Sequence, residues 1–393
     1  MKTQLEHHAR IPTQVLNRHA HTSNMRLDPI RKEIVGICCN LRGVAAATHN
    51  TRTYTMLFDV LYPNVFPIFA KAIAQCHDFP ALTTAVLKFM IEFVENKMQR
   101  ITFGHCSPNG ILLFREVSKI TNAFGRAALV GFKQHVPPAE LYKKRYKGIT
   151  LMLNMLTNIF SGRYVNFGVF ELYNDTALSS AMAISIQCAG AIPTEHILQY
   201  PKVAASYYNF LEILFRSHLK MVVRFDVSVF KKFVHNLYRG LESLNASVAG
   251  RCASTIDHIA SYYFRHCKKL SPREKDVETA RKLQQFILAT SQRFFTEMLG
   301  FLFKIVLISR DKAMNQWLLS RPILSLTLCD DTAMDNVTKF LISTQSPQNQ
   351  PRLREELYKL KCGTKPNLSQ ANRDMFSQKL NKFRREILKF MKR

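Results

Sequence analysis

Helix-length stretches with apolar residues at helical spacing follow one another along almost the whole chain, and only short gaps separate them. Apolar residues three and four positions apart share one face of a helix, whereas a half-buried strand needs strict alternation. Such alternation is scarce here, and so are glycine-rich turns. The pattern therefore predicts an all-α chain.

Proline marks the start of several of these helices. Asp28-Pro29, Ser107-Pro108 and Ser271-Pro272 each place a capping residue before a proline at the first helical position. Pro137-Pro138 opens another helix, which is expected to stop at Ser161-Gly162. The remaining helices are predicted at residues 51–61, 81–99, 177–191, 203–219, 228–243, 248–266, 292–309, 313–329, 333–344, 353–361 and 370–391.

The spacing and the apolar coverage of the helices predict how they pack. Successive helix starts lie roughly 25 residues apart, so that two helices occupy about 40–50 residues, as in HEAT-type pairs. The helix at 203–219 carries apolar side chains on one stripe and beside it: Tyr207, Tyr208, Phe210, Leu211, Leu214, Phe215 and Leu219. Such wide coverage requires neighbours on more than one side. We expect a HEAT-repeat-like α-solenoid, a superhelix of antiparallel helix pairs, over residues 27–393.

The two ends of the chain are predicted to differ. Residues 1–26 are mostly polar and basic and are expected to form a disordered tail. The helix near 370–391 gathers Phe376, Leu380, Phe383 and Ile387 on one face and cations elsewhere, as a terminal capping helix requires. The start has no comparable cap, so the array is expected to continue upstream in a longer protein.

The segment at residues 164–178 carries aromatic rings at every third position: Tyr164, Phe167, Phe170 and Tyr173. On a helix this spacing fans the rings over about half the circumference, and aliphatic residues fill the rest, which predicts a buried helix. Gly168 would let another backbone approach closely. A strand is the alternative. Because single-strand binders pair rings with cationic tracks and the local charges here are mixed, we expect packing and not base stacking.

Charge is the unusual feature of the composition. The chain has 55 Lys+Arg against 28 Asp+Glu, a net charge of +27, and such an excess attracts nucleic acid, anionic lipid or acidic proteins. Basic residues cluster in three runs, at 143–147, 265–269 and 382–393. Each run is interpreted as a solvated helix face, and a binding patch for acidic protein or nucleic acid is the alternative.

Motifs of catalysis and of metal binding are missing from the sequence. There is no GxxxxGK[ST], GxGxxG, GxSxG or HExxH. Adjacent His and Cys, at 76–77, 105–106 and 266–267, diverge by about 100° on a helix and suit no single zinc site. The acidic pairs at 330–331 and 355–356 are interpreted as ordinary helix-end or surface acids. We expect no enzymatic activity and no catalytic, cofactor-binding or metal-binding residue.

The cysteines and the apolar segments bear on the compartment. The nine cysteines are scattered without a CxxC pair, which indicates reduced thiols in the nucleus or cytosol. No stretch of about 20 residues is apolar enough to cross a bilayer. The best candidate, at 294–309, contains Glu297 and Lys304 and is interpreted as a buried core helix. Membrane insertion is not expected.

Six stretches carry a family resemblance: LDPIRKEIVGI at 27–37, SPNGILLFREVSKI at 107–120, YVNFGVFELYNDTAL at 164–178, YPKVAASYYNFLEIL at 200–214, NQWLLSRPILSL at 315–326 and NRDMFSQKLNKFRREI at 372–387. Together, and in this order, they resemble the C-terminal third of the exportin-7 family of nuclear transport receptors, in the importin-β (karyopherin) superfamily. A match of this length is far more specific than a short motif.

The resemblance implies a HEAT-repeat superhelix that shuttles between nucleus and cytoplasm and carries protein cargo through nuclear pores under the control of Ran-GTP. Its implied partners are protein cargo, Ran-GTP and nuclear pore proteins, and no cargo- or Ran-binding residue is assigned. The rival hypothesis rests on the charge: a basic helical-repeat scaffold that binds nucleic acid or acidic proteins.

Overall fold

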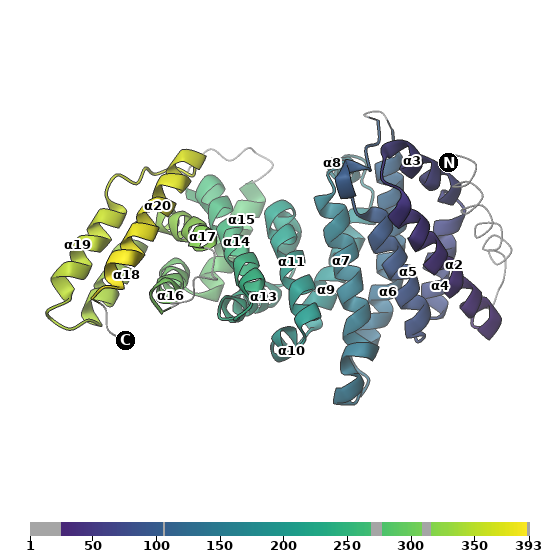
Figure 1. Ribbon diagram of the computed structural model, residues 1–393, viewed down its shortest axis with the longest axis horizontal. Coiled ribbons are helices and arrows are strands. Elements are labelled where there is room, and N and C mark those ends of the chain that lie inside the picture. The colour runs from purple at the N-terminus through teal and green to yellow at the C-terminus, as the bar shows by residue number, and fades with distance from the viewer. Residues whose placement is uncertain (1–24, 105–106, 269–276, 309–315, 391–393) are drawn as a thin grey trace. The chain divides into compact units, whose positions relative to one another are not determined.

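The computed structural model describes residues 25–104, 107–268, 277–308 and 316–390 (Figure 1). All regular elements in these ranges are helices, so the all-α prediction is confirmed, and the packed helical arrangement agrees with a helical-repeat solenoid. The chain divides into two compact units, residues 1–210 and 211–393, and the boundary falls inside α11 (Pro201–Ser217).

The first unit stacks its helices in two series. In one series α2 packs on α5 and α5 on α7, and in the other α4 packs on α6 and α6 on α9. Contacts of α4 with α5, α6 with α7 and α7 with α9 join the two series. The bounds are α2 Asp28–Ala47, α4 Val65–Gln75, α5 Pro80–Val94, α6 Asn109–Gly131, α7 Lys147–Ser161 and α9 Ala177–Ala191. Helices α4, α5, α6, α7 and α9 each pack against two or more neighbours, as wide apolar coverage requires.

The second unit repeats this principle. Helix α14 packs on α17 and α17 on α20, while α13, α15, α16, α18 and α19 follow one another beside this series. The bounds are α13 Val227–Leu241, α14 Ala246–Tyr263, α15 Val277–Thr290, α16 Phe294–Ile308, α17 Gln316–Cys329, α18 Ala333–Ser343, α19 Gln350–Lys361 and α20 Gln370–Ile387. The described residues of the two units also contain shorter helices: α3 Thr51–Leu61, α8 Gly168–Leu172, α10 Thr194–Gln199 and α12 Leu219–Val222.

Most predicted helices are present, and α3 and α9 have the predicted bounds. Helix α4 was not predicted, because Pro67 interrupts its apolar pattern. That proline lies in the first turn, where its missing N–H group is not needed for an intrahelical hydrogen bond. The predicted start at Ser271-Pro272 lies outside the described residues.

The prediction of one buried helix at 164–178 is wrong, and so is the strand alternative. The backbone enters the left-handed region at Arg163 and Asn174, with φ of 61° and 53°. The helical parts of the segment are the five residues of α8 and the first two residues of α9. Leu172 and Tyr173 are exposed. Short polar side chains compete for backbone N–H groups here: Asn166 Oδ1 accepts from Gly168 N at 3.2 Å and Asp175 Oδ1 from Ala177 N at 2.8 Å.

Three of the four rings in that segment nevertheless pack as expected. Phe167 and Phe170 each lie 5.1 Å from the Phe114 ring, measured between centroids, and Tyr164 donates its hydroxyl to the Val94 carbonyl at 2.7 Å. The close backbone approach predicted at Gly168 occurs instead at Gly110, where an added Cβ would lie 2.4 Å from the Tyr164 carbonyl oxygen.

The ends of the chain are described in part. Residues 1–24 of the expected basic tail lie outside the described residues, and Met25 is buried. In α20, the predicted face of Phe376, Leu380, Phe383 and Ile387 is buried. Two basic residues of the same helix, Arg373 and Arg384, are buried beside it.

Within the described ranges, no single helix has both the length and the apolar character needed to span a membrane. The pair α3 and α4 meets those two criteria only when taken together, and it is bent by 61°.

Candidate partner-binding groove

Several basic side chains are bound to the carboxyl ends of helices. The last carbonyl groups of a helix have no partner within it and carry partial negative charge. Arg100 is 1% exposed, and its Nη1 donates to the carbonyls of Ala45 at 2.6 Å and Thr48 at 2.9 Å, at the end of α2. Its Nη2 and Nε donate to the Glu92 and Glu95 carbonyls at the end of α5. One arginine therefore caps two helices.

Each of the three basic runs supplies a cap of the same kind. Arg145, Lys268 and Arg384 donate to carbonyls at the ends of α6, α17 and α16: Gly131 at 3.4 Å, Leu328 at 2.9 Å and Val306 at 3.2 Å. The interpretation of these runs as solvated faces is therefore incomplete, because one cation of each run is used by the fold.

Two of the runs are wound as a single π-helical turn, a geometry that is frequent at functional sites. The first, Tyr142–Tyr146, leads into α7 and is anchored by its rings. Tyr146 is buried with its hydroxyl 2.5 Å from Nδ1 of His196, and Tyr142 stacks on Tyr200 at 5.8 Å between centroids. Lys143 and Lys144, between these anchors, are exposed.

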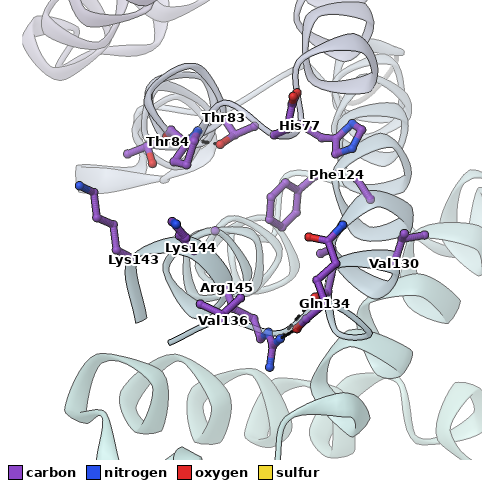
Figure 2. Close-up of a pocket in the computed structure, with 16 residues that line it drawn as sticks. His77, Thr83, Thr84, Phe124, Val130, Gln134, Val136, Lys143, Lys144 and Arg145 are labelled. Atoms are coloured by element: carbon purple, nitrogen blue, oxygen red, sulfur yellow. Dashed lines mark hydrogen bonds between the residues drawn. The ribbon is translucent and has the colours of Figure 1, made fainter. Parts of the chain in front are cut away.

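This turn forms one wall of a groove of about 300 Å³ in the first unit (Figure 2). The start of α5 and the end of α6 form the other walls. Figure 2 shows the Phe124 ring near the centre, Thr83 and Thr84 along one edge, and Lys143 and Lys144 on one side. The lining residues are His77, Asp78, Pro80, Thr83, Thr84, Phe124, Ala127, Ala128, Val130, Gly131, Gln134, Val136, Lys143, Lys144, Arg145 and Gly148.

The floor of the groove is apolar and built from small side chains. Phe124 is buried, and Ala127 and Ala128 next to it on α6 leave space above the helix. Gly148 lets the Phe124 ring lie against α7, because an added Cβ there would be 2.4 Å from the ring carbon Cζ. The ring is thus wedged between two helices, which fixes the floor.

The rim of the groove has an excess of positive charge. Lys144 pairs with Glu140 at 2.6 Å, and this hydrogen bond holds the pKa of the Glu140 carboxyl below its usual range. The charge of Lys143 acts on the same carboxyl and lowers its pKa further, and its side chain is exposed. Asp78, the one carboxylate among the lining residues, pairs with Arg26. Helix α5 begins without a side-chain cap, so the positive end of its dipole adds to the field.

The other residues considered from the sequence have structural roles or lie apart. Cys76 donates to the Met25 carbonyl at 3.3 Å, Cys267 to the Ala280 carbonyl at 3.5 Å, and His105-Cys106 lies outside the described residues. No set of three or more His, Cys, Asp or Glu side chains within the described ranges is placed to hold a metal ion.

The two acidic pairs are helix-end and surface acids, as predicted. Asp330 accepts from Thr332 N at 2.9 Å at the start of α18, and Asp331 pairs with Lys268 at 2.7 Å. Glu355 and Glu356 pair with Lys359 on the surface of α19. The side-chain hydrogen bonds from Lys359 lower the pKa of Glu355.

Comparison with known proteins gives the family relationship. No family model matches the chain. Exportin-7-B of Xenopus laevis is 34% identical over 374 residues, which cover 95% of this chain and 34% of that protein. The chain is similar to exportin-7 over nearly its whole length. Exportin-7 of Dictyostelium discoideum is 27% identical over 367 residues, and Ran-binding protein 17 of Homo sapiens is 31% identical over 369 residues.

The chain spans about a third of the length of these exportin-7 relatives. The resemblance to the exportin-7 family is therefore confirmed across this chain, and the assignment to the C-terminal third of the relatives stays a prediction. The stretch at 27–37 lies in α2, where Ile30, Ile34 and Ile37 are buried, and the stretch at 372–387 lies in α20. Exportin-7-like stretches thus supply helices of both units.

Proposed function

We propose that the chain is a segment of an exportin-7-like nuclear transport receptor, which carries protein cargo through nuclear pores under the control of Ran-GTP. The observation that supports this is the similarity to exportin-7 and Ran-binding proteins over 92–95% of the chain. Stacked helices offer long surfaces for protein partners. Shuttling between nucleus and cytoplasm, contact with nuclear pore proteins and the lack of enzymatic activity are parts of the same proposal.

A binding experiment tests this function. The immobilised chain is incubated with Ran loaded with a non-hydrolysable GTP analogue or with GDP, alone and with nuclear extract. We expect recovery of the GTP form in preference to the GDP form, and recovery of proteins that depend on it. Recovery of neither Ran-GTP nor any shuttling cargo would remove the transport function.

A second candidate is a basic helical scaffold for nucleic acid or acidic proteins, and the charge of +27 favours it. Phosphate contacts release counterions, so binding of this kind weakens steeply with salt. Titration with labelled single-stranded RNA from low to moderate salt distinguishes the two candidates. Absence of RNA binding at low salt would eliminate nucleic acid as the partner.

A further inference from the structure

The groove between α5, α6 and the Tyr142–Tyr146 turn has cations at its rim and an apolar floor. Lys143 and Lys144 project from a π turn whose two tyrosines are anchored, so their backbone positions are fixed. Asp78, which lies just before α5 in the sequence, is already paired with Arg26. A ligand that suits this groove carries negative charge toward the lysines and a small apolar group over Ala127 and Ala128.

The same contacts disfavour nucleic acid as the occupant. Single strands bind proteins by stacking successive bases on exposed rings. Of the two aromatic rings among the lining residues, Phe124 is 7% exposed, and the exposed His77 has its Nδ1 3.4 Å from the Ala74 carbonyl oxygen, so the groove offers one exposed ring and no series of them. Arg145 is engaged with the Gln134 carbonyl and lies over the Phe132 ring, so its planar face is not open to a base. The volume of about 300 Å³ suits a few side chains and lies at the lower end for ligand pockets.

We propose that this groove binds an acidic, extended peptide segment of a partner protein. One small aliphatic side chain of the peptide lies over Ala127 and Ala128, and its carboxylates lie beside Lys143 and Lys144. The uncapped start of α5 attracts the same carboxylates. The inference rests on the protein-binding part of the proposed function, and it adds the chemistry of the partner and the place where it binds.

The probe is a fluorescein-labelled octapeptide of Glu and Asp with one central valine, and binding to the full chain is measured by anisotropy. The double reversal Lys143→Glu with Lys144→Glu is expected to weaken binding by at least about tenfold, because it replaces attraction by repulsion at the rim. The matched control is Lys339→Glu with Lys382→Glu, which changes the net charge equally at exposed positions of α18 and α20. The control is expected to bind like the wild type.

Two further arms test the floor and the ligand. Ala128→Phe fills the space above α6 and is expected to weaken binding of the valine peptide while leaving the circular dichroism spectrum unchanged. A neutral peptide, with Gln and Asn in place of Glu and Asp, is expected not to bind. Equal losses in both double reversals, equal binding of the neutral peptide, or no binding of the acidic peptide at low salt would each overturn the proposal.

Two comparisons separate this proposal from its rivals. A labelled oligouridine that binds more tightly than the peptide and is lost in the Lys143 and Lys144 reversal would assign the groove to nucleic acid and overturn the proposal. Binding of the peptide without recovery of Ran-GTP would overturn the transport function but would still support peptide binding in the groove. Recovery of Ran-GTP without binding of the peptide would overturn the groove alone.

Discussion

Arg373 of α20 donates from Nη1 to both carboxylate oxygens of Asp257 in α14, at 3.1 and 3.0 Å. The two side chains are each 10% exposed, and Nη2 of Arg373 donates to the Ser261 hydroxyl at 2.9 Å. The pair joins helices that are 116 residues apart in sequence. Because both charges are removed from water, each depends on the other for its stability in the interior.

Arg373→Ala is therefore expected to lower the free energy of unfolding by about 3–5 kcal/mol, since it leaves the Asp257 carboxylate buried and unpaired. Urea denaturation followed by circular dichroism measures the change. The control is Arg239→Ala, which breaks an exposed pair with Glu242 and is expected to cost less than about 1 kcal/mol. Equal effects of the two substitutions would show that the buried pair has no special role.

Arg100→Met is expected to destabilise the first unit by about 3 kcal/mol, because it removes the donors from carbonyl groups of two helix ends at once. Amide hydrogen exchange should rise in the last turns of α2 and α5. Arg100→Lys is expected to recover little, since an ammonium group cannot reach carbonyls on both helices in the fork geometry of a guanidinium. Arg52→Ala, at an exposed position of α3, serves as the control. If Arg100→Lys were as stable as the wild type, the capping of two helices by one guanidinium would not explain the stability.

Two glycine substitutions are expected to act in opposite directions. Gly110→Ala forces a Cβ to 2.4 Å from the Tyr164 carbonyl oxygen, and that backbone must shift at a cost of about 1–3 kcal/mol. Gly43→Ala, on an exposed face of α2 with nothing within 4 Å, is expected to stabilise the helix by roughly 0.5–1 kcal/mol. Thermal denaturation of both variants tests the pair, and a neutral Gly110→Ala would contradict the close approach.

The stability of the second unit is expected to fall with acid because of His218. Burial, and secondarily the charge of Lys220, lowers the pKa of His218 to about 4 from 6.5. The unfolded chain then binds more protons than the folded chain between these values, so the free energy of unfolding decreases as the pH falls from about 6.5 toward about 4. The loss is on the order of 3 kcal/mol, since one pKa unit corresponds to about 1.36 kcal/mol. His218→Asn should flatten this dependence, whereas replacement of the exposed His235 should not.

The positions of most helices were predictable because the apolar residues that a helix buries recur at helical spacing in the sequence. The same residues determine which face of the helix packs against its neighbours. Thr51–Leu61 and Ala177–Ala191 are found with the predicted bounds. The helix predicted at 81–99 ends instead at Val94, where Tyr54, Tyr164 and Arg100 donate to its last carbonyls. Arg100 is local, but Tyr54 and Tyr164 lie 39 and 70 residues from the carbonyls they contact, so a local pattern could not indicate these two contacts.

The groove was predictable only in part. The sequence marked the basic run at 143–147, and the structure places Lys143 and Lys144 on the groove wall. The floor could not be inferred, because Ala127 and Ala128 have no distinctive pattern and Gly148 matters only through its contact with Phe124. A basic run also combines two roles that its sequence does not distinguish: all three cations line the groove, and Arg145 in addition donates to the end of α6.

The capping arginines and lysines restrict how this protein can be re-engineered. A designer who lowers its net charge, to improve expression or crystal growth, can exchange surface positions such as Lys339 at little cost. The same exchange at Arg100 or Arg384 would remove hydrogen bonds to the last carbonyl groups of the helices they cap and would destabilise those helix ends. The positive charge of a surface lysine can be removed without affecting the fold, whereas removing the charge of a capping arginine also removes contacts that hold helix ends together.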